Sequence, residues 1–501
     1  MNERRSAREA VARVTSAFTE LPTPRGTSAP DGPIVWQGYD ASRGRAAEHT
    51  GEDESVVCGT GLIGATEAVL ISFEFGFLGG SLGERTGDRL EAAYSHARER
   101  RLPVVSLIAT GGSRMQEGMR ALVQLQRVAH QSALTREAGL PQLAVVCDPT
   151  TGGGWATLGA GADVILALPG AQIGFAGARV RPPDADPRAY TAEAQLAAGA
   201  IDDVVPEEDL RDTLARWLPL LTGGSVTPTG DATGAEPDKD AAPPTAAGPA
   251  APATGRAPGP GTAGRLAPPA GRSPQPAPPP AALGGTELPG TGWDAVRQAR
   301  SPERPRADAY LDAYFETREA IRGDRCGGTD PGIRCGFGLR EGRAIAYAAQ
   351  CGTPTLPAGY RTAARLIRLA DRLGVPVLTL VDTPGAANDA EAERAGAGAA
   401  IADLFTAVAT ARVPVTTLLI GEGGSGGALA FAAPHNTWAT PDSYFSVIAP
   451  ELAAAILKRT PDDTRTTADQ LRLRPQDLVD LGVARGIVPR HPSRPDGPAT
   501  A

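Results

Sequence analysis

The chain has 501 residues, long enough for two domains rather than one, and 41% of them are apolar, enough for two sizeable cores. A net charge of −8 disfavours a surface that binds a phosphate backbone, so we expect no nucleic-acid partner. No apolar run is long enough to span a membrane, and the five cysteines include no closely spaced pair of the kind that holds zinc. These features predict a cytoplasmic protein without a metal site.

The first domain is expected over residues 31–220, after a flexible arm formed by residues 1–30. Residues 103–109 and 142–147 are apolar runs that predict buried strands, and each ends in a glycine-rich turn. Between them the spacing predicts a helix, whose apolar face is formed by Met115, Met119, Leu122 and Val123.

The composition changes over residues 221–291, which are rich in Pro, Ala, Gly, Thr and Ser. Such a segment has too few large side chains to offset the entropy lost on ordering, so it predicts a disordered Pro/Ala/Gly-rich linker. A second domain is expected over residues 292–490, followed by a flexible tail, residues 491–501.

The second domain repeats the plan of the first. Its predicted strands begin at Pro376 and Pro414, each 273 residues after the corresponding Pro103 and Pro141, and each again runs into a glycine-rich turn. Residues 399–405 take the place of the intervening helix. The same order of strand, turn, helix and strand at a constant offset indicates a duplicated α/β domain.

Four glycine-rich turns are candidates for a functional site: Gly111–Gly112, Gly152–Gly153, Gly385–Ala386 and Gly427–Ala428. A turn from a buried strand into a helix leaves backbone N–H groups unpaired, and the helix dipole adds a positive potential. Such groups can stabilise an oxyanion that develops on a substrate carbonyl. The alternative is that these turns only connect the elements and bind no ligand.

Other chemistries fit the sequence less well. G-x-S-x-G patterns surround Ser81 and Ser425, as in a hydrolase nucleophile elbow, but the only histidines after Ser425 are His435 and His491. No Lys-Ser or Lys-Thr follows the glycines, which disfavours a phosphate-binding P-loop. Three acidic residues end strands near the turns, and for each a structural role is favoured over a catalytic one: Asp148, Asp382 and Glu422.

Longer motifs follow one another in both halves. In the front half they are residues 56–61, 73–83, 111–117, 148–153, 173–177 and 199–202. In the back half they are Trp293 and residues 323–325, 357–361, 382–386, 421–429 and 444–451. In this order they resemble the beta and alpha subunits, respectively, of the bacterial acetyl-CoA carboxylase carboxyltransferase, joined into one chain.

The resemblance implies two tandem crotonase-like domains, each a ββα superhelix. It implies transfer of a carboxyl group from carboxybiotin, carried on a partner protein, to an acyl-CoA, with acetyl-CoA giving malonyl-CoA for fatty-acid biosynthesis. The family needs no side-chain nucleophile, because the biotin anion takes the α-proton and the thioester enolate attacks carbon dioxide. Biotin carboxylase and the biotin carboxyl carrier protein are the implied partners, and a homodimer is the implied assembly.

The resemblance also implies roles for the turns and for their neighbours. Catalysis by backbone donors falls to Gly111, Gly112, Gly152, Gly153, Gly427 and Ala428. The residues implied to bind acyl-CoA are Phe77, Gly79, Gly80, Ser81 and Arg114. The residues implied to bind carboxybiotin are Gly385, Ala386, Gly424, Ser425 and Gly426.

The chain departs from the family in three places. No cysteine precedes Trp36, where bacterial beta subunits carry a zinc ribbon, so no zinc is expected. Residues 386–389 replace the usual Tyr-Pro-Gly stretch, and a polar segment after Gln350 is shortened. Because both changes fall on the biotin side, three alternatives stay open. They are a decarboxylase of malonyl thioesters, a carboxyltransferase for another acyl-CoA in a specialised pathway, and a non-catalytic CoA-binding scaffold.

Overall fold

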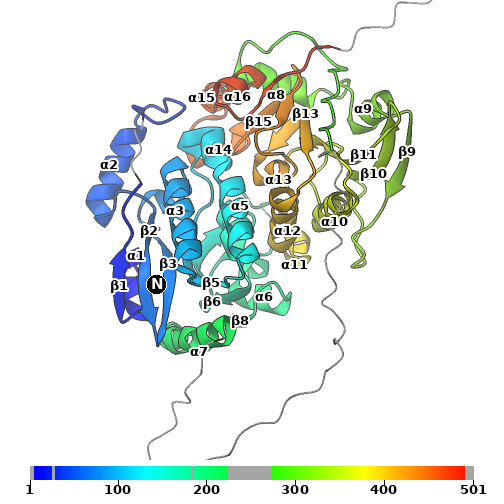
Figure 1. Ribbon diagram of the computed structural model, residues 1–501. Helices are drawn as coiled ribbons and strands as arrows, with labels where there is room; N and C mark the ends of the chain where they lie inside the picture. The colour runs from blue at the N-terminus through cyan, green and yellow to red at the C-terminus, as the bar shows by residue number, and fades with distance from the viewer. Residues whose placement is uncertain (1–4, 25–28, 183, 224–273, 491–501) are drawn as a thin grey trace, which may run out of the picture.

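The computed structural model describes residues 5–24, 29–182, 184–223 and 274–490, which form two α/β halves packed side by side (Figure 1). The front half runs from blue to green in Figure 1, and the back half from green to red. The expected disorder of the linker between residues 224 and 273, and of the tail 491–501, concerns residues outside those described.

The front half is built on one sheet with the strand order β1-β2-β3-β4-β5-β6-β8, and β7 pairs with β5. Its first three strands are antiparallel, and the pairs from β3 to β8 are parallel. The strands are β1 Ala17–Glu20, β2 Val56–Ile63, β3 Thr66–Phe73, β4 Val104–Thr110, β5 Gln142–Thr151, β6 Val164–Ala167, β7 Ile173–Gly174 and β8 Asp203–Val204.

The back half repeats this sheet strand for strand, in the order β9-β10-β11-β12-β13-β14-β16, with β15 paired to β13. The pairing of β4 with β5 shifts register between Ile108 and Thr110, and that of β12 with β13 shifts between Val381 and Thr383, the equivalent positions 273 residues on. The strands are β9 Thr317–Ile321, β10 Ile333–Arg340, β11 Arg343–Gln350, β12 Val377–Thr383, β13 Val415–Gly424, β14 Thr437–Ala439, β15 Tyr444–Ser446 and β16 Gly486–Ile487. The prediction of two tandem α/β domains with one plan is confirmed.

Helices cover both faces of each sheet. The front helices are α1 Ala7–Val14, α2 Tyr39–Thr50, α3 Glu84–Arg100, α4 Gly118–Leu122, α5 Gln124–Glu137, α6 Ala192–Ala197 and α7 Leu210–Thr222, with short helical turns η1 Leu78–Gly80, η2 Met115–Glu117, η3 Trp155–Gly159, η4 Pro187–Tyr190 and η5 Glu207–Asp209. The back helices are α8 Gly292–Arg300, α9 Ala307–Tyr314, α10 Pro357–Leu373, α11 Ala390–Arg394, α12 Ala397–Thr410, α13 Ser425–Leu429, α14 Pro450–Ile456, α15 Thr464–Gln470 and α16 Pro475–Asp480, with η6 Pro461–Asp463.

One hydrophobic core joins the halves. It takes in residues of α3 and α5 from the front half and of α10 and α12 from the back half, and α5 packs directly against α12. The outer faces have separate cores, with α1 and α7 on the front sheet and α9 on the back sheet. Each half therefore buries one face of its sheet against helices that also meet the other half.

The predicted helix around Met115 is broken in the structure. Gly118 has φ +55° and separates η2 from α4, and a new helix, α5, begins at Gln124. A positive φ is readily adopted by glycine and interrupts the helical path. The four apolar residues therefore lie on η2, on α4 and at the junction before α5 rather than on one helix.

The N-terminal arm is not wholly flexible, in contrast with the expectation for residues 1–30. Ser6 caps α1 through a capping box with Glu9, and the buried residues Ala7, Val11 and Val14 fix the helix on the front sheet. After α1, the chain adds β1 to the sheet edge through pairing with β2. Residues 7–20 are therefore part of the front domain.

The expected linker is also too long at its C-terminal end. Ala277 and Ala282 are buried in the outer core of the back half, and the Ala282 N–H donates to the Pro489 carbonyl at 2.9 Å. The Thr416 hydroxyl donates to the carbonyl of Ala277 at 2.7 Å. This part of the Pro- and Ala-rich segment packs because small residues fit closely against the sheet.

Candidate active site

The first front turn follows β4 and is fixed by two backbone donors. The Gly111 N–H donates to the Gly79 carbonyl at 2.9 Å, and the Gly112 N–H donates to the Thr110 hydroxyl at 3.1 Å. Gly112 has φ +100°, a conformation that side chains other than glycine rarely adopt. The glycine is therefore required by the backbone path of the turn.

The second front turn, after β5, lies directly against the first. A Cβ added to Gly152 would be 3.2 Å from the Cα of Gly112. The Gly152 N–H donates to the Gly174 carbonyl at 3.1 Å, and Gly153 begins the helical segment that leads into η3. The structure thus brings both predicted front turns together at one end of the sheet, with a helix start beside them.

The back half forms the same arrangement. The Gly385 N–H donates to the Thr383 hydroxyl at 3.1 Å, as Gly112 does to Thr110 in the front half. A Cβ on Gly427 would lie 2.4 Å from the backbone nitrogen of Ala386, so the turn after β12 and the start of α13 are in contact.

The repeat shows that the second turn of the back half lies two residues earlier than predicted. At the offset of 273 residues, Gly112 matches Gly385, while Gly152 and Gly153 match Ser425 and Gly426. Ser425 has φ +53° at the position where Gly152 has φ +65°. Gly427 and Ala428, predicted as the catalytic turn, lie two residues further along α13, at the positions that match Gly154 and Trp155.

The two sets of turns approach each other across the contact between the halves. A Cβ on Gly153 would touch the Leu125 side chain at 2.4 Å, and a Cβ on Gly426 would reach the same side chain at 3.5 Å. At the position equivalent to Leu125, Gly398 of α12 leaves room for the Trp155 indole, whose Nε1 lies 2.1 Å from where a Cβ would be. The front and back helix starts therefore lie on either side of one leucine.

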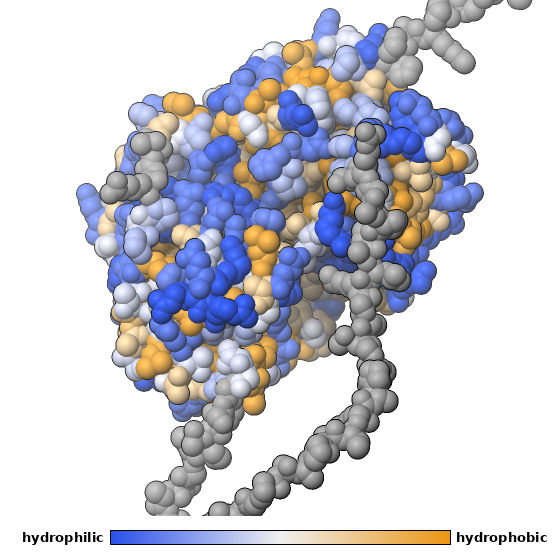
Figure 2. All heavy atoms as spheres, in the orientation of Figure 1, coloured by the Kyte–Doolittle hydropathy of each residue, from blue (hydrophilic) through white to orange (hydrophobic). Residues whose placement is uncertain are grey.

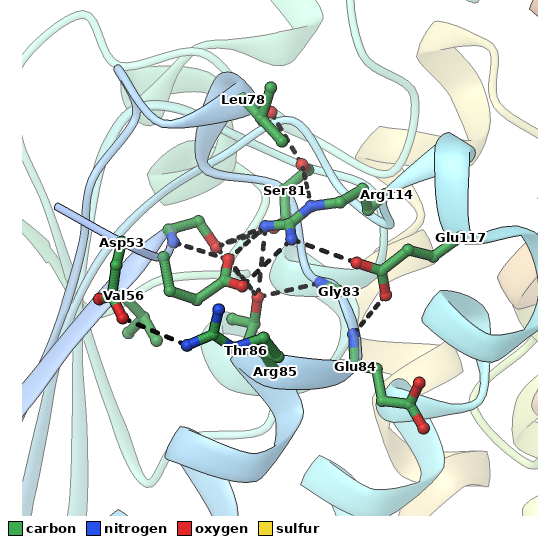
Figure 3. A network of polar contacts seen from close by, with 12 residues as sticks. Asp53, Val56, Leu78, Ser81, Gly83, Glu84, Arg85, Thr86, Arg114 and Glu117 are labelled. Carbon is green, nitrogen blue, oxygen red and sulfur yellow. Dashed lines mark hydrogen bonds and ion pairs between the residues drawn. The ribbon is translucent and has the colours of Figure 1, made fainter. Parts of the chain in front are cut away.

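Arg114, predicted to bind CoA, is instead buried in the protein. Its side chain is 1% exposed and forms ion pairs with Glu54 at 2.5 Å and Glu117 at 3.3 Å (Figure 3). Burial by itself raises the pKa of Glu54, but the Arg114 charge and hydrogen bonds outweigh it and lower that pKa to about 2. The Arg114 guanidinium also donates to the Ser81 carbonyl at 2.7 Å. Arg114 thus holds the loop before α3 rather than reaching toward a ligand.

The other residues predicted for the acyl-CoA side form that loop. Phe77 is buried beneath Arg114, with the guanidinium carbon 5.7 Å from the ring centroid. A Cβ on Gly80 would lie 2.1 Å from the Ala109 carbonyl oxygen, whereas one on Gly79 would meet no atom within 4 Å. Gly79 therefore faces open space beside the Gly111 turn, while Phe77 and Gly80 pack beneath it.

The favoured structural role for Asp382 agrees with its surroundings. Its carboxylate is fully buried and pairs with Arg304 at 2.6 Å and Arg306 at 3.2 Å. It also accepts from the Glu422 N–H at 3.2 Å, so it joins the ends of β12 and β13 where the back turns begin. Residue spacing gave no signal for Arg304, which is 78 positions away in the chain.

The remaining acidic residues are likewise bound within the fold. Glu422 pairs with Arg300 at 3.0 Å and accepts from the Tyr444 hydroxyl. The Asp148 carboxylate accepts from the Gln172 N–H at 3.0 Å.

The structure gives a serine hydrolase little support. His435 is exposed, and across the described ranges no hydrogen bond joins Ser425 to a histidine. His491 lies outside the described residues. Groups of three or more His, Cys, Asp or Glu side chains placed to hold a metal ion do not occur among the residues whose positions are described.

Three further properties complete the description. Within the described residues, no helix combines the length and the apolar character needed to cross a membrane. On the face drawn in Figure 2, hydrophilic residues are interspersed with smaller hydrophobic patches. A cavity of ≈ 590 Å³ lies at the edge of the back sheet, between β9, β10 and β11, and contains none of the predicted site residues.

The sequence matches known families in both halves. Residues 36–203 match the carboxyl transferase domain family, and residues 290–494 match the acetyl co-enzyme A carboxylase carboxyltransferase-like family.

Two curated relatives match along most of the chain. The acetyl-coenzyme A carboxylase carboxyl transferase subunits beta/alpha of Saccharopolyspora erythraea is 35% identical over 466 residues, which cover 90% of this chain and 74% of that protein. A probable biotin-dependent acyl-coenzyme A carboxylase beta3 subunit of Mycobacterium bovis is 31% identical over 481 residues, covering 93% and 86%.

Among solved structures, a transcarboxylase 12S chain with hydrolysed methylmalonyl-coenzyme A bound covers 99% of this chain and 92% of its own, at 19% identity and a TM-score of 0.37. The shared sequence, over both halves and in the same order, is what decides the relationship. The chain belongs to the acetyl-CoA carboxylase carboxyltransferase family, with a beta-like half followed by an alpha-like half.

Proposed function

We propose that this enzyme transfers a carboxyl group from carboxybiotin to acetyl-CoA and so produces malonyl-CoA. The observation that carries the proposal is the matched pair of glycine turns in a member of this family, one pair in each half, with the two helix starts on either side of Leu125. Two carbonyl substrates that must exchange a carboxyl group need two sites for oxyanions, and the duplicated turns supply one in each half.

In this proposal the front turns hold the thioester. The Gly153 N–H, at the helix start, donates to the oxyanion of the acyl-CoA enolate, and Gly79 and Ser81 line its approach. Gly111, Gly112 and Gly152, whose own N–H groups bond within the protein, and the buried Gly80 shape the backbone around this donor. The back turns, at Gly385, Ala386 and Gly424–Ala428, hold the ureido carbonyl of carboxybiotin. The biotin ring supplies the carboxyl group and accepts the α-proton, so the chain contributes position and backbone donors rather than a side-chain nucleophile.

In this proposal carboxybiotin arrives on another protein. The methionines of the chain are Met1, Met115 and Met119, and none lies in an Ala-Met-Lys-Met biotinylation sequence. We propose a biotin carboxylase and a biotin carboxyl carrier protein as partners in the cytoplasm, and a homodimer as the assembly. No zinc is part of the proposed reaction.

The test is the reverse reaction. Purified protein is incubated with malonyl-CoA and free biotin or biocytin, and acetyl-CoA is measured. Acetyl-CoA that forms only with biotin supports the proposal, whereas biotin-independent release of carbon dioxide would replace it with malonyl-thioester decarboxylation.

The identity of the acyl group is tested in the same assay. The Mycobacterium bovis relative is described only as an acyl-coenzyme A carboxylase subunit, so methylmalonyl-CoA and longer malonyl thioesters are compared with malonyl-CoA. A higher kcat/KM for one of these would change the proposed substrate while retaining the reaction. No turnover with any of them, even with the carrier protein supplied, together with weak CoA binding, would favour the scaffold alternative.

A further inference from the structure

Glu393 is a buried carboxyl group at the contact between the two halves. It lies on α11 of the back half, is 1% exposed, and accepts a hydrogen bond from the backbone N–H of Phe175 in the front half at 2.6 Å. Its second oxygen, Oε2, is buried and is one of the side-chain atoms that have no hydrogen-bond partner in the described part of the chain. Burial of a carboxyl oxygen without a hydrogen-bond partner costs free energy, so the position of Glu393 requires an explanation.

On the front side, Glu393 bonds to the residue that follows β7. That strand pairs with the end of β5 through Thr151 and Gly174, and the Gly174 carbonyl accepts from the N–H of Gly152. Gly174 has no room for a side chain, because a Cβ would lie 3.0 Å from the Glu393 carboxylate oxygen Oε1. A single hydrogen bond, donated by the Phe175 N–H, therefore links Glu393 to the end of β7, the strand whose Gly174 carbonyl fixes the Gly152 turn.

On the back side, Glu393 follows the loop that leaves Gly385. Asp389 ends this loop and caps α11 through a hydrogen bond from the Ala392 N–H at 2.8 Å. The Asn388 carbonyl accepts from the hydroxyl of Tyr190 at 2.8 Å, and the Asn388 side chain donates to the Val180 carbonyl at 3.4 Å. The loop that replaces the usual Tyr-Pro-Gly stretch thus bonds directly to the front half.

We infer that Glu393 is a positioning residue, which ties the loop after Gly385 to the Gly152 turn so that the two halves present their backbone donors in one fixed arrangement. The contacts form a continuous path from Gly385 through α11, Glu393 and β7 to Gly152. The inference deepens the proposed function and rests on it for the activity measurements below.

The surroundings of Glu393 place its titration in the neutral range. Burial raises the pKa of Glu393 to about 7, although the N–H groups of Phe175 and Ala176 and the charge of Arg181 oppose this. The other charged and titratable groups that face this contact are Asp389, the N-cap of α11, Arg394, its last residue, and Tyr190 of η4. The Tyr190 ring lies 3.8 Å from the Arg181 guanidinium carbon. The ionised carboxylate accepts more strongly from Phe175 than the protonated form does, so this hydrogen bond strengthens as pH rises through this range. The buried charge lowers the stability of the fold as a whole over the same range.

The variants are Glu393→Gln, Glu393→Ala and, as a matched control, Glu391→Gln, which makes the same change at an exposed carboxylate on the same helix. In the malonyl-CoA and biocytin assay, Glu393→Ala should lower kcat by about 10- to 100-fold, the range expected when reacting groups are displaced by about 1 Å, with little change in KM for malonyl-CoA. Glu393→Gln should restore part of that kcat and lose the rise in activity near pH 7 that the parent chain and Glu391→Gln show. A parent-like pH profile for Glu393→Gln would overturn the inference.

A second measurement tests the link between Glu393 and the Gly152 turn without relying on enzyme activity. Amide hydrogen exchange of peptides covering residues 148–154 and 172–178 should become faster in Glu393→Ala and stay unchanged in Glu391→Gln. If the parent chain has no transferase activity, the proposed function fails, and the exchange data still report on the tie. Unchanged exchange in Glu393→Ala, in a variant that keeps its unfolding midpoint, would overturn the inference by itself.

Discussion

The two halves share a backbone plan but fix their turns with charges in different places. In the front half the buried ion pairs come after the turn, where Arg114 bonds Glu54 and Glu117. At the equivalent position the back half has Ala387, and its buried ion pair comes before the turn, where Asp382 bonds Arg304. The repeat therefore preserves the turn geometry, while the buried ion pairs that support the turns lie at non-equivalent positions in the two halves.

The same contrast separates the two buried carboxyl groups near the turns. Glu54 is fully paired and its pKa is lowered to about 2. Glu393 has one oxygen without a hydrogen-bond partner among the described residues, and its pKa is raised to about 7. The front carboxylate is fixed in one charge state at neutral pH. The back carboxyl, at the contact between the halves, can change its charge there.

The largest expected effect is on stability, from removal of the front ion pair. Arg114→Ala should lower the free energy of unfolding by about 3–5 kcal/mol, because Glu54 is left as an uncompensated buried charge. Arg304→Ala should cost less, since Arg306 still pairs with Asp382. Denaturant unfolding of both variants measures the difference.

A surface ion pair provides the control for this pair of variants. Arg85→Ala removes a contact of 3.2 Å to the exposed Asp53 and should change the free energy of unfolding by less than about 1 kcal/mol. A loss for Arg114→Ala no larger than that of Arg85→Ala would show that the buried network does not support the front turn.

The next effect is on catalysis and should separate the substrates of the two halves. Gly112→Ala and Gly385→Ala place a Cβ where φ is positive, which should displace the helix starts packed against these turns and the backbone donors they carry. Each should lower kcat of the reverse reaction by about 10²- to 10³-fold. Gly112→Ala should also raise KM for malonyl-CoA, and Gly385→Ala should raise KM for biocytin. Steady-state kinetics with each substrate varied in turn measures both.

The strain that a Cβ causes at a positive φ is calibrated by a glycine outside the turns. Gly374 ends α10 with φ +68° and has no atom within 4 Å of an added Cβ. Gly374→Ala should lose about 1 kcal/mol of stability and keep its kinetic constants. Both turn variants raising the KM of the same substrate would contradict the assignment of one substrate to each half.

The two carboxyl groups should give opposite dependences of stability on pH. The folded state lowers the pKa of Glu54, so its contribution is present above about pH 4.5 and is lost as pH falls toward 2. It raises the pKa of Glu393, so that contribution is present below about pH 4.5 and is lost as pH rises to about 7.

Glu393→Gln isolates the second contribution. The parent chain should lose up to about 3 kcal/mol of unfolding free energy between pH 4.5 and pH 8 through Glu393, and the variant should lack this loss. Denaturant titrations at several pH values, with Glu391→Gln beside them, provide the measurement. Parallel pH curves for the parent chain and Glu393→Gln would mean that Glu393 does not titrate in this range.

The central strands and the turns could be predicted from the sequence because they repeat at one offset. Buried parallel strands read as short apolar runs, and the connections between them have equal lengths in both halves, so the glycines after β4 and β12 align 273 residues apart. The same regularity did not fix which residues of α13 match Gly152 and Gly153, because GGSGG offers several glycines in a row.

The N-terminal elements were missed because their offset differs. β1 begins at Ala17 and β9 at Thr317, 300 residues apart, while the hairpins β2–β3 and β10–β11 are 277 apart. Connections of unequal length hide such a repeat from a search at constant spacing.

The support of the site was missed for another reason. Glu54 is 60 residues from Arg114, and Phe175 is 218 residues from Glu393. Only the packed sheets bring such partners together, so nothing local in the sequence marks them.

The smallest effect tests whether the arm belongs to the front domain through its helix cap. Ser6 caps α1 by accepting from the Glu9 N–H at 3.2 Å, whereas the N-cap residue of its counterpart α9, Arg306, makes no side-chain capping bond within the described residues. Ser6→Ala should therefore lower the free energy of unfolding by about 1 kcal/mol and speed amide exchange in β1. Ser42→Ala, inside α2, is the control.

The outcome distinguishes two ways of holding the arm. Besides the cap, α1 is held by the Ala7 N–H, which donates to Glu74 at 2.8 Å, and by the buried side chain of Val11. If Ser6→Ala leaves exchange in β1 unchanged while Val11→Ala accelerates it, burial rather than capping holds the arm. The front and back helices would then be attached in the same way, since α9 has no side-chain cap and is held by its buried residues Tyr310 and Leu311.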